Sequence, residues 1–593
     1  MKSSVSDKPM SVSSGSRLDQ NGGELALPAR RPNSRKRTAT GSGVLTSVYV
    51  AVFTVVALLA LIPLIALLLG SLRDASPGLP GNWTLANWAG LASPGVVETM
   101  LTTIVVAGLS TAFAMIIGTA LALLIHRTDF RWPALMTGLL ALSFYFPSFI
   151  LAMAWIVIGS PGGLINDILR DVLGIEAGVD IYTVSGIIFV MVLHQVPFVY
   201  LTIRGPVMGM DPSYEEAART AGASPWRMLR KVTLPMLAYA LASSALLCLV
   251  LALEQFGIPV LLGVPGHVTV LATQIYLLCR FPPTAYGLAA TVGLALAIIT
   301  GAVILLQRRL AHGGRSVVTT GKAGKIAPIP LGAWRWPVNL LCSFYIAISL
   351  VLPSLILLYT SVIKFFTANP FDAAFTFRNY TYIWESEEIH LAIVNTMIVS
   401  GGGALIGVLL GLACSYFTVR LRPTGYRVLD ALVMLPFGVP GIVLGLGLLW
   451  AYAYLPLPLY GTLTLVVLAY ITRFLPYATE TAGARLVQLD RSLEEAAWTS
   501  GASQLSGVWR ILMPLSLPSL QSGYFLLFMA FFREISATIL IFTASTSVLS
   551  VSIWNAFEQA NWGLASALSI AAMILMVAVM SLMLWAMPGA RRR

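Results

Sequence analysis

Charged residues are scarce in this sequence. Asp, Glu, Lys and Arg together make up only 10% of the 593 residues, whereas they account for roughly a quarter of a typical soluble globular protein. Hydrophobic residues make up 57%, and the mean hydropathy is +0.82. So few charges could not cover the surface of a soluble chain of this length. The composition therefore excludes a water-soluble enzyme or nucleic-acid-binding protein, and lipid must be the solvent for most of the chain.

Residues that usually carry chemistry are also few and scattered. The four cysteines form no Cys-x-x-Cys pair, so we expect neither a disulfide framework nor a metal site. The five histidines form no His-Glu-x-x-His motif or other ligand cluster. The segment Gly314–Lys322 is the nearest approach to a phosphate-binding loop, but its spacing is one residue too long and Ala323 stands where Ser or Thr is needed. We therefore expect no catalytic residue, metal site or cofactor in this chain.

Long apolar runs are what the sequence has instead. A helix needs roughly 20 apolar residues to cross the hydrocarbon core of a bilayer. Twelve stretches meet this requirement, and the fourth and the tenth are the least regular because each contains proline and polar residues. The first half holds the stretches near 45–71, 99–125, 134–158, 183–203, 236–264 and 284–306. The second half holds those near 337–362, 391–417, 428–452, 461–483, 515–543 and 563–587.

The basic residues indicate how these stretches are oriented. Residues 1–43 form a polar, basic segment without an apolar period, and we expect a disordered tail there. Most of the 37 Lys and Arg residues fall in this tail and in the loops on the same side of the membrane. By the positive-inside rule both termini are predicted to be cytoplasmic. A basic tail beside a membrane span is not expected to bind nucleic acid. The outer side receives only Arg73, Arg170, Arg280, Lys364 and Arg378.

The chain contains an internal duplication, because motifs of the first half recur in the same order in the second. We predict an all-α membrane protein of about twelve transmembrane helices, built as two parallel six-span repeats at 44–306 and 337–593 with a cytoplasmic linker at 307–336. Six spans per repeat place the pseudo-twofold axis along the membrane normal, so a pathway would run between the halves. The recurring motifs are Trp83–Trp88 with Phe375–Tyr380, Asp211–Ala218 with Asp490–Ala497, Val270–Tyr276 with Val548–Trp554, and Tyr286–Ala289 with Trp562–Ala565.

The cytoplasmic loop after the fourth span of each repeat carries the most specific pattern. Ser213-x-x-Glu216 fits a capping box that would begin a short helix, and Asp211-Pro212 offers a competing start. A glycine then allows a sharp turn, and Ser224 can cap a second helical piece. We expect one rigid object, used twice, that lies beneath the bilayer and docks into a groove on another protein. Its equally spaced residues are Glu215, Glu216, Ala217, Ala218, Gly222 and Pro235 in one copy and Glu494, Glu495, Ala496, Ala497, Gly501 and Pro514 in the other.

Glu-Ala-Ala followed by Gly and Leu-Pro at this spacing resembles the cytoplasmic-loop signature of permease subunits of binding-protein-dependent ABC importers. The resemblance covers both halves, and Met513 in place of the usual Leu before Pro514 is a volume-conserving change. Two copies in one chain are similar to the fused permeases for ferric iron, thiamine, aminoethylphosphonate or polyamines. The segments Phe146–Leu151, Phe256–Gly263 and Gly438–Gly445 look most like the ferric-iron branch.

The resemblance implies a multi-pass permease in a bacterial inner membrane that imports a solute, with ferric iron favoured, and that hydrolyses no ATP itself. Two copies of a separate cytoplasmic subunit would bind ATP and Mg²⁺ and dock on the two loops through the equally spaced residues given above. A periplasmic solute-binding protein would release the solute into the gap between the halves. The remoter alternative is a self-sufficient, ion-coupled secondary transporter with two six-span halves.

Several polar residues lie at membrane depth, where they are costly and usually face a pathway or a partner. Glu254 and Glu534 are related by an offset of 280, and we interpret them, together with Arg473, as candidates for lining the pathway. The alternative is a structural ion pair or a position near the membrane interface. Glycines four residues apart in the stretch 391–417 favour close helix packing. The full set at membrane depth is His194, Glu254, Arg473, Arg533 and Glu534.

Overall fold

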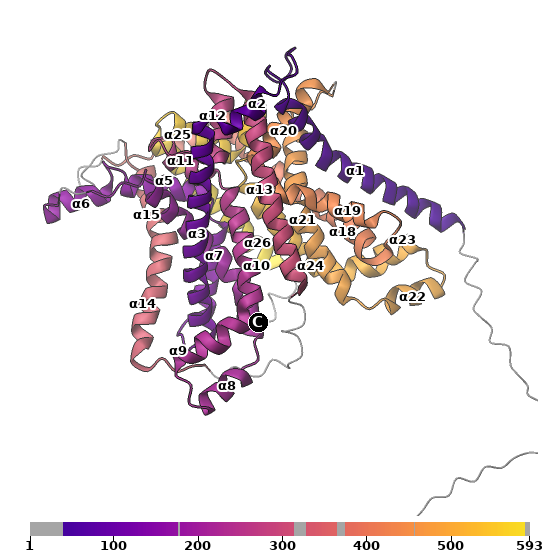
Figure 1. Cartoon of the computed structure of the whole chain (residues 1–593), viewed down its shortest axis with the longest axis horizontal. Helices are drawn as coiled ribbons and strands as arrows, with labels where there is room; N and C mark the ends of the chain where they lie inside the picture. The colour runs from indigo at the N-terminus through magenta and orange to yellow at the C-terminus, as the bar shows by residue number, and fades with distance from the viewer. Residues whose placement is uncertain (1–38, 176–177, 314–327, 365–373, 456, 587–593) are drawn as a thin grey trace, which may run out of the picture.

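The structure is a computed structural model (Figure 1), and it describes residues 39–175, 178–313, 328–364, 374–455 and 457–586. Over these residues the chain is helical, and β contacts are limited to three isolated bridges. The predicted all-α membrane fold is confirmed. Most of the tail predicted at 1–43 lies outside the described residues, as do residues 314–327 of the linker predicted at 307–336, which include the segment Gly314–Lys322.

Helices form where the apolar runs were expected, because a backbone surrounded by lipid must satisfy its own hydrogen bonds. The first repeat contains α1 (Ala39–Ser71), α2 (Ala86–Ala89), α3 (Pro94–Arg127), α4 (Pro133–Tyr145), α5 (Ser148–Gly159), α6 (Leu164–Leu173), α7 (Val184–Gly209), α8 (Ser213–Thr220), α9 (Pro225–Met228), α10 (Leu234–Leu253), α11 (Gly257–Gly263), α12 (Leu271–Arg280) and α13 (Tyr286–Gly313).

The second repeat follows the same order with local differences in length. It contains α14 (Arg335–Ile346), α15 (Leu352–Ser361), α16 (Arg378–Glu385), α17 (Glu387–Met397), α18 (Gly403–Ser415), α19 (Tyr426–Met434), α20 (Gly441–Tyr454), α21 (Leu463–Gln488), α22 (Ser492–Thr499), α23 (Gln504–Gly507), α24 (Met513–Phe532), α25 (Leu549–Glu558) and α26 (Trp562–Ala586).

Two of the predicted spans are broken rather than continuous. The stretch near 134–158 divides into α4 and α5 at Pro147, and the stretch near 428–452 divides into α19 and α20, which meet at an angle of 109°. Proline lacks a backbone N–H and its ring clashes with the preceding turn, so a straight helix does not continue through Pro147 or Pro440. In each repeat the second piece, α5 or α20, is almost wholly buried.

The described residues hold ten helices that are long and apolar enough to cross a membrane, or eleven if the bent pair α19–α20 counts as one span. The predicted count of about twelve agrees with this number when α21 is included. The predicted tenth span corresponds to α21, which has 26 residues but is not among those helices. Arg473, Glu480 and Arg485 lower its apolar character. Its buried face lies inside the bundle, against α18 and α24, rather than against lipid.

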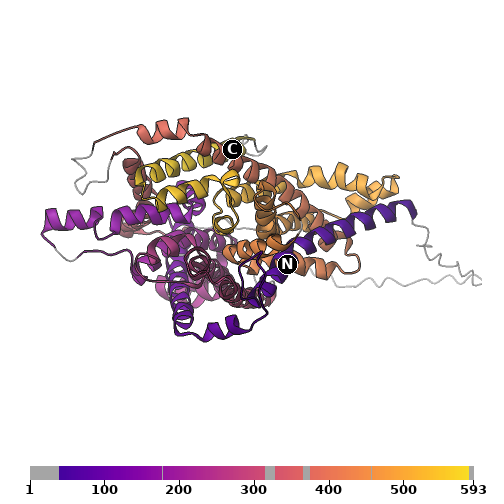
Figure 2. The same cartoon turned by 90° about the horizontal axis from the view of Figure 1, so that it is seen from above.

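The first membrane helix of each repeat packs against the other repeat. Helix α1 of the first repeat packs against α20 of the second, and α15 of the second packs against α5 of the first. The view from above shows α1 crossing the second repeat (Figure 2). The approach is close, since a Cβ at Gly447 would overlap the carbonyl of Pro63 on α1. On the opposite side, Tyr345 Oη of α14 donates a hydrogen bond of 2.8 Å to the carbonyl of Leu193 on α7. The halves are therefore intertwined.

The recurring motifs occupy equivalent places in the two repeats. Asn87 lies against Gly287, so that a Cβ at this glycine would overlap the Asn87 amide, and Asn379 lies against Gly563 in the same way. The Asn379 amide also donates 2.9 Å to the Ser361 carbonyl, as the Asn87 amide does to the Ser71 carbonyl at 3.0 Å. In each repeat, two recurring motifs that are distant in sequence are therefore in contact, because the glycine of one leaves room for the asparagine of the other.

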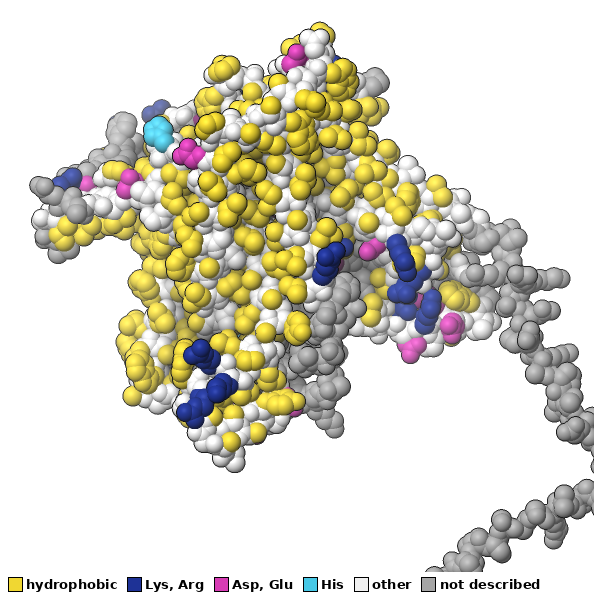
Figure 3. All heavy atoms as spheres, viewed as in Figure 1, with side chains coloured by type: hydrophobic (Ala, Val, Ile, Leu, Met, Phe, Trp, Pro, Cys, Tyr) yellow, Lys and Arg dark blue, Asp and Glu magenta, His cyan; other side chains and the backbone are white. Residues whose placement is uncertain are grey.

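The outer face of the bundle suits a lipid environment. Figure 3 shows hydrophobic side chains over most of the middle of one face, along α3, α10 and α13, and Lys and Arg toward its lower end. Exposed apolar side chains on these helices and on α1 include Leu58, Ile65, Leu101, Ile104, Ile116, Ile298 and Leu305. In water a patch of this extent would be an association site. Here it is the surface that the bilayer covers.

The glycines of α18 provide a test of helix packing. A Cβ at Gly411 would lie 2.6 Å from Ala478 Cβ and 2.8 Å from its carbonyl carbon on α21. We expect Gly411→Leu to destabilise the protein by about 1–3 kcal/mol or more through overpacking, measured as a lower melting temperature of the purified protein in detergent. Gly402→Leu is the matched control, because nothing lies within 4 Å of a Cβ there. Equal melting temperatures for both variants would contradict this packing.

Candidate functional site

The two predicted cytoplasmic loops have the same structure. Each consists of an eight-residue helix, α8 or α22, followed by a turn and a shorter helix, α9 or α23. Figure 1 shows α8 and α22 well apart from each other, on the side of the molecule opposite α12 and α25. The expectation of one object used twice is confirmed in its geometry. Pro235 and Pro514 are the second residues of α10 and α24, each of which continues directly from a π-helical turn, Leu229–Thr233 or Val508–Leu512.

The start of each short helix differs from the expected capping box. The side chains of Ser213 and Ser492 do not cap α8 and α22. Instead, Asp211 Oδ1 accepts the backbone N–H of Ser213 at 2.9 Å, and Asp490 Oδ1 accepts that of Ser492 at 2.9 Å. This hydrogen bond holds the pKa of both aspartates below its usual range. The competing start at Asp211-Pro212 is therefore the one that the chain uses, because Pro212 already has a helical backbone conformation.

The predicted glycine turns and second caps are present. Gly222 has φ +78° and Gly501 has φ +87°, a left-handed conformation that residues with a Cβ rarely adopt. After the turn, Ser224 Oγ accepts the N–H of Arg227 at 3.4 Å, and Ser503 Oγ accepts that of Ser506 at 3.2 Å. No atom lies within 4 Å of a Cβ at either glycine, so conformation alone requires glycine there.

The first glutamate of each loop points inward. Glu215 is buried, its Oε2 lies 2.7 Å from Arg127 Nη2 at the end of α3, and its Oε1 accepts a hydrogen bond of 2.8 Å from Thr233. Glu494 is buried 3.4 Å from Arg420 Nε. Burial raises the pKa of Glu494, and the charge of Arg420 opposes that shift. These two glutamates tie the loops to their own repeats and are not available to a partner's surface.

The remaining loop residues lie on or near the surface. Glu216 and Ala217, and their counterparts Glu495 and Ala496, are exposed, and Ala218 and Ala497 are half-buried. Large apolar side chains accompany them, with Tyr214 57% and Trp226 70% exposed in the first copy and Leu493 40% exposed in the second. An exposed helix with small side chains flanked by large apolar ones has the composition of a docking surface. The docking role of each residue stays a prediction.

Sequence reasoning missed the arginines that anchor the loops. Arg127 and Arg420 are almost fully buried, and they lie at equivalent positions in the two repeats, six residues before α4 and α19 begin. In the sequence they count only as basic residues of cytoplasmic loops. The sequence feature that could have identified these arginines is their common spacing to the next helix, since exposed arginines do not have to keep a fixed position.

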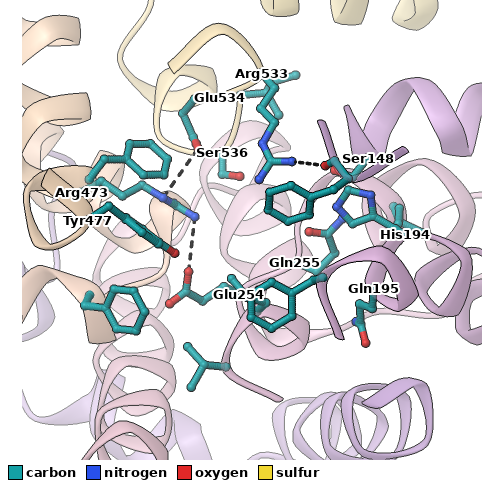
Figure 4. Close-up of a pocket in the computed structure, with 18 of the residues that line it drawn as sticks. Ser148, His194, Gln195, Glu254, Gln255, Arg473, Tyr477, Arg533, Glu534 and Ser536 are labelled. Atoms are coloured by element: carbon teal, nitrogen blue, oxygen red, sulfur yellow. Dashed lines mark hydrogen bonds and ion pairs between the residues drawn. The ribbon is translucent and has the colours of Figure 1, made fainter. Parts of the chain in front are cut away.

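A second site lies between the two repeats. A cavity of about 130 Å³ is lined by residues of α5, α7, α10, α21 and the segment after α24. Figure 4 shows the polar side chains that converge there from both repeats. They are Ser148, His194, Gln195, Glu254, Gln255, Arg473, Tyr477, Arg533, Glu534 and Ser536.

Arg473 joins the two repeats in this cavity. Its Nη2 lies 3.3 Å from Glu254 Oε2 of the first repeat, and its Nε lies 3.6 Å from Glu534 Oε2 of its own repeat (Figure 4). A Cβ at Gly441 would overlap the guanidinium, so a glycine at the start of α20 makes room for it. The three predicted residues form ion pairs and also line this cavity, and their place along a solute pathway stays a prediction.

The equivalence proposed for Glu254 and Glu534 is wrong by one residue. Helices α10 and α24 begin 279 residues apart, at Leu234 and Met513, as do α7 and α21. At this offset Glu254 corresponds to Arg533, and His194 corresponds to Arg473. The loops that contain α8 and α22 are also 279 residues apart in the sequence, and this offset would have identified both pairs of equivalent residues. Equivalent positions at the pseudo-twofold axis thus carry different chemical groups.

Both polar and apolar side chains line the cavity. Four of its polar atoms have no hydrogen-bond partner within the described part of the chain, namely Glu254 Oε1, Gln255 Nε2, His194 Nδ1 and Arg473 Nη1. Buried polar groups without partners are rare, and they indicate a place for water or a polar solute. Across the described residues no group of three or more His, Cys, Asp and Glu side chains could hold a metal ion. The cavity therefore has unpaired polar groups that water or a polar solute could bind.

Comparison with known proteins decides the family. The family described as "Binding-protein-dependent transport system inner membrane component" matches residues 114–313 and again residues 403–592. The chain belongs to this family. It is a multi-pass inner membrane permease of an ABC importer with a duplicated permease domain, as the sequence indicated. The second match falls within the repeat predicted at 337–593, whereas the first extends to residue 313, beyond the repeat predicted at 44–306. The boundaries of both repeats stay a prediction.

Similar proteins include ferric transport permeases. The permease is 28% identical over 497 residues to "Ferric transport system permease protein FbpB" of Actinobacillus pleuropneumoniae, covering 83% of this chain and 71% of that protein. It is 30% identical to "Putative ferric transport system permease protein FbpB 1" of Haemophilus influenzae, covering 68% of this chain and 64% of the relative. A solved bacterial alginate ABC transporter in complex with a periplasmic protein matches 40% of this chain and 85% of its own, with 22% identity and a TM-score of 0.35.

The loop anchor can be tested by removing one partner of a buried pair. Glu215→Ala leaves Arg127 buried without its carboxylate, and we expect a loss of about 3–5 kcal/mol of stability. Faster trypsin cleavage at the exposed Arg219 would show that the loop has loosened. Glu216→Ala is the control, since Glu216 is exposed one residue away and its removal leaves the anchor intact. Equal cleavage rates for the two variants would argue against the anchor.

The charge cluster gives a second prediction. Arg473→Leu leaves two buried carboxylates, Glu254 and Glu534, without their shared cation, so we expect a lower melting temperature in detergent than for the native permease. Arg473→Lys keeps a cation on a shorter reach and should lose less stability. A leucine variant as stable as the native protein would show that the cluster is not a structural bridge.

Proposed function

We propose that this permease imports its solute by coupling to a separate ATP-hydrolysing subunit, two copies of which dock on α8 and α22. The observation that carries the proposal is the paired loop, the same rigid object presented twice on one side of the molecule. ATP and Mg²⁺ would bind between the partner subunits and not in this chain. ATP-driven closure of the partners would draw α8 and α22 together and tilt the repeats as stiff bodies.

The anchors support this coupling. A docked subunit can move a repeat only if the loop does not yield, and the buried pairs Arg127–Glu215 and Arg420–Glu494 fix each loop to the long helices of its repeat. The exposed residues left for docking are Glu216, Ala217 and Gly222 in the first copy, with the half-buried Ala218 beside them, and their counterparts Glu495, Ala496, Gly501 and Ala497 in the second.

The same side of the molecule is proposed to face the cytoplasm, together with both termini. Exposed basic residues gather around the loops, as the positive-inside rule requires, and they include Arg219, Arg227, Arg230, Lys231, Arg491 and Arg510. The opposite side, with α12 and α25, would then face the periplasm and receive the solute from a binding protein. The name of the family includes dependence on such a protein.

Ferric iron is the proposed solute. Support comes from the ferric transport permeases among the relatives. The cavity between the repeats has no set of three metal-ligating side chains among the described residues, so selection of iron would rest with the binding protein and the permease would provide a polar passage. Thiamine, aminoethylphosphonate or a polyamine is the alternative cargo, and uptake of radioactive iron against these competitors separates the four.

The docking proposal predicts the effect of a paired glycine substitution. Gly222→Val with Gly501→Val forces a β-branched residue into a left-handed conformation at both turns, at a cost of about 1–2 kcal/mol each. We expect the variant to insert in the membrane at normal abundance but to lose both co-purification with the ATP-hydrolysing subunit and solute uptake.

The control for this experiment is Gly174→Val. Gly174 ends α6 with φ +63° and has no atom within 4 Å of a Cβ, so its local strain matches that at Gly222, but it lies away from the two loops. Normal partner binding by the double variant would contradict docking through α8 and α22. Uptake driven by an ion gradient in vesicles that lack the partner subunit would favour the secondary-transporter alternative.

A further inference from the structure

The recurring motif at Val270–Tyr276 and Val548–Trp554 has no part in ATPase docking or in the cavity's charge cluster. It forms the short helices α12 and α25, which are ten residues long in both repeats and lie on the side opposite α8 and α22 (Figure 1). Each helix starts on a hydrogen bond to its own repeat. Thr103 Oγ1 accepts the N–H of Leu271 at 2.8 Å, and Thr396 Oγ1 accepts the N–H of Leu549 at 2.7 Å.

The two short helices meet across the pseudo-twofold axis through equivalent residues. They start 278 residues apart, so Tyr276 corresponds to Trp554 and Arg280 corresponds to Glu558. The rings of Tyr276 and Trp554 pack edge to face with centroids 5.9 Å apart. Phe256 of the first repeat completes the group, 5.6 Å from Tyr276 and 6.2 Å from Trp554. All three aromatic side chains are buried, so this layer excludes water between the repeats.

Polar contacts cover the aromatic layer on its outer side. Tyr276 Oη donates a hydrogen bond of 2.8 Å to Glu558 Oε1, and Arg280 Nη2 lies 4.0 Å from Glu558 Oε2. The side chain of Arg280 is 63% exposed, so this end of the contact is at the surface. In a symmetric homodimer these equivalent positions would carry identical charges and repel each other. The fused chain has Arg in one repeat and Glu in the other, which turns the axis contact into an attraction.

The layer also lies next to the cavity between the repeats. Phe256 follows two residues after Glu254, whose unpaired Oε1 faces the cavity. From the outer surface inward the axis therefore carries an exposed ion pair, a buried aromatic layer and this cavity, each made of residues from both repeats. The loops α8 and α22 on the other side are apart while these contacts are closed (Figure 1).

We propose that Phe256, Tyr276 and Trp554, with the Arg280–Glu558 pair above them, form the outer gate of this permease. The gate is closed in the present conformation, and it opens when the repeats tilt and carry α12 away from α25. Because each short helix is tied to its own repeat, separation of the repeats must break the ring contacts, the tyrosine hydrogen bond and the ion pair. The direction of passage through this gate rests on the function proposed above.

A cleavable cross-link across the ion pair tests the gate. The full chain with Arg280→Cys and Glu558→Cys is treated with a short, cleavable bis-maleimide in membranes that contain the complete importer. The native cysteines among the described residues are all buried, and each single variant controls for their reaction. We expect efficient linking without nucleotide, loss of ferric iron uptake in the linked protein, and recovery when the linker is cleaved. Trapping the partner subunit with ATP and vanadate before treatment should lower the linking yield.

The matched control is a pair within one repeat on the same side of the molecule. Arg73 and Trp83 face each other in an isolated antiparallel bridge of the first repeat, so Arg73→Cys with Trp83→Cys should link without loss of uptake. A charge reversal in both residues, R280E with E558R, should retain uptake better than either reversal alone, because only the double variant restores an attraction.

The outcomes separate the gate from the function on which it rests. Failure of the pair at 280 and 558 to link, or unhindered uptake by the linked protein, overturns the gate. Linking that blocks uptake but does not respond to trapped nucleotide supports the gate and contradicts drive by ATP. A linking yield that falls on nucleotide trapping, in a protein that never takes up iron, supports the gate and overturns iron as the cargo.

Discussion

Two buried ion pairs hold the short helices α8 and α22 in place on their repeats. Arg127 with Glu215 and Arg420 with Glu494 connect the cytoplasmic loops to the long helices, and both partners of each pair are withdrawn from water. A buried pair is weak evidence for net stability, because desolvation offsets much of its Coulombic attraction. Its value here is geometric. It fixes α8 or α22 on its repeat, so that a subunit docked as proposed above would push on the helical bundle instead of bending a loop.

Because both repeats belong to one chain, equivalent positions at the pseudo-twofold axis can hold different residues, which two identical subunits cannot do. Residues at the axis of a homodimer face their own copies, so opposite charges cannot meet there. In this chain Arg280 faces its equivalent Glu558, and in the cavity the position of Glu254 corresponds to that of Arg533. The two repeats have kept the same backbone and diverged in charge, and ion pairs join them at two levels, between Arg280 and Glu558 and between Arg473 and Glu254.

Much of this organisation was predictable from the sequence because it depends on local pattern. Apolar runs gave the helices, and the equal spacing of Glu216 to Gly222 and Glu495 to Gly501 gave the paired loops with their left-handed glycines. What was missed depends on distant partners. Nothing local distinguishes Glu215, which pairs with Arg127, from Glu216, which faces outward. The exchange of α1 onto α20 likewise follows from a close approach at Gly447 that no single stretch reveals.

The exchanged helices would allow the repeats to tilt, as proposed above, without separating. Helix α1 stays packed on α20 of the second repeat, and Tyr345 of α14 stays bonded to Leu193 of the first, so contacts on opposite sides of the molecule hold the halves together. On the function proposed above, motion would then be confined to the axis. Arg280–Glu558 is long and partly exposed, and such pairs contribute little to stability. The proposed gate would use this division, with extensive packing at the periphery and a weak ion pair at the outer end of the axis.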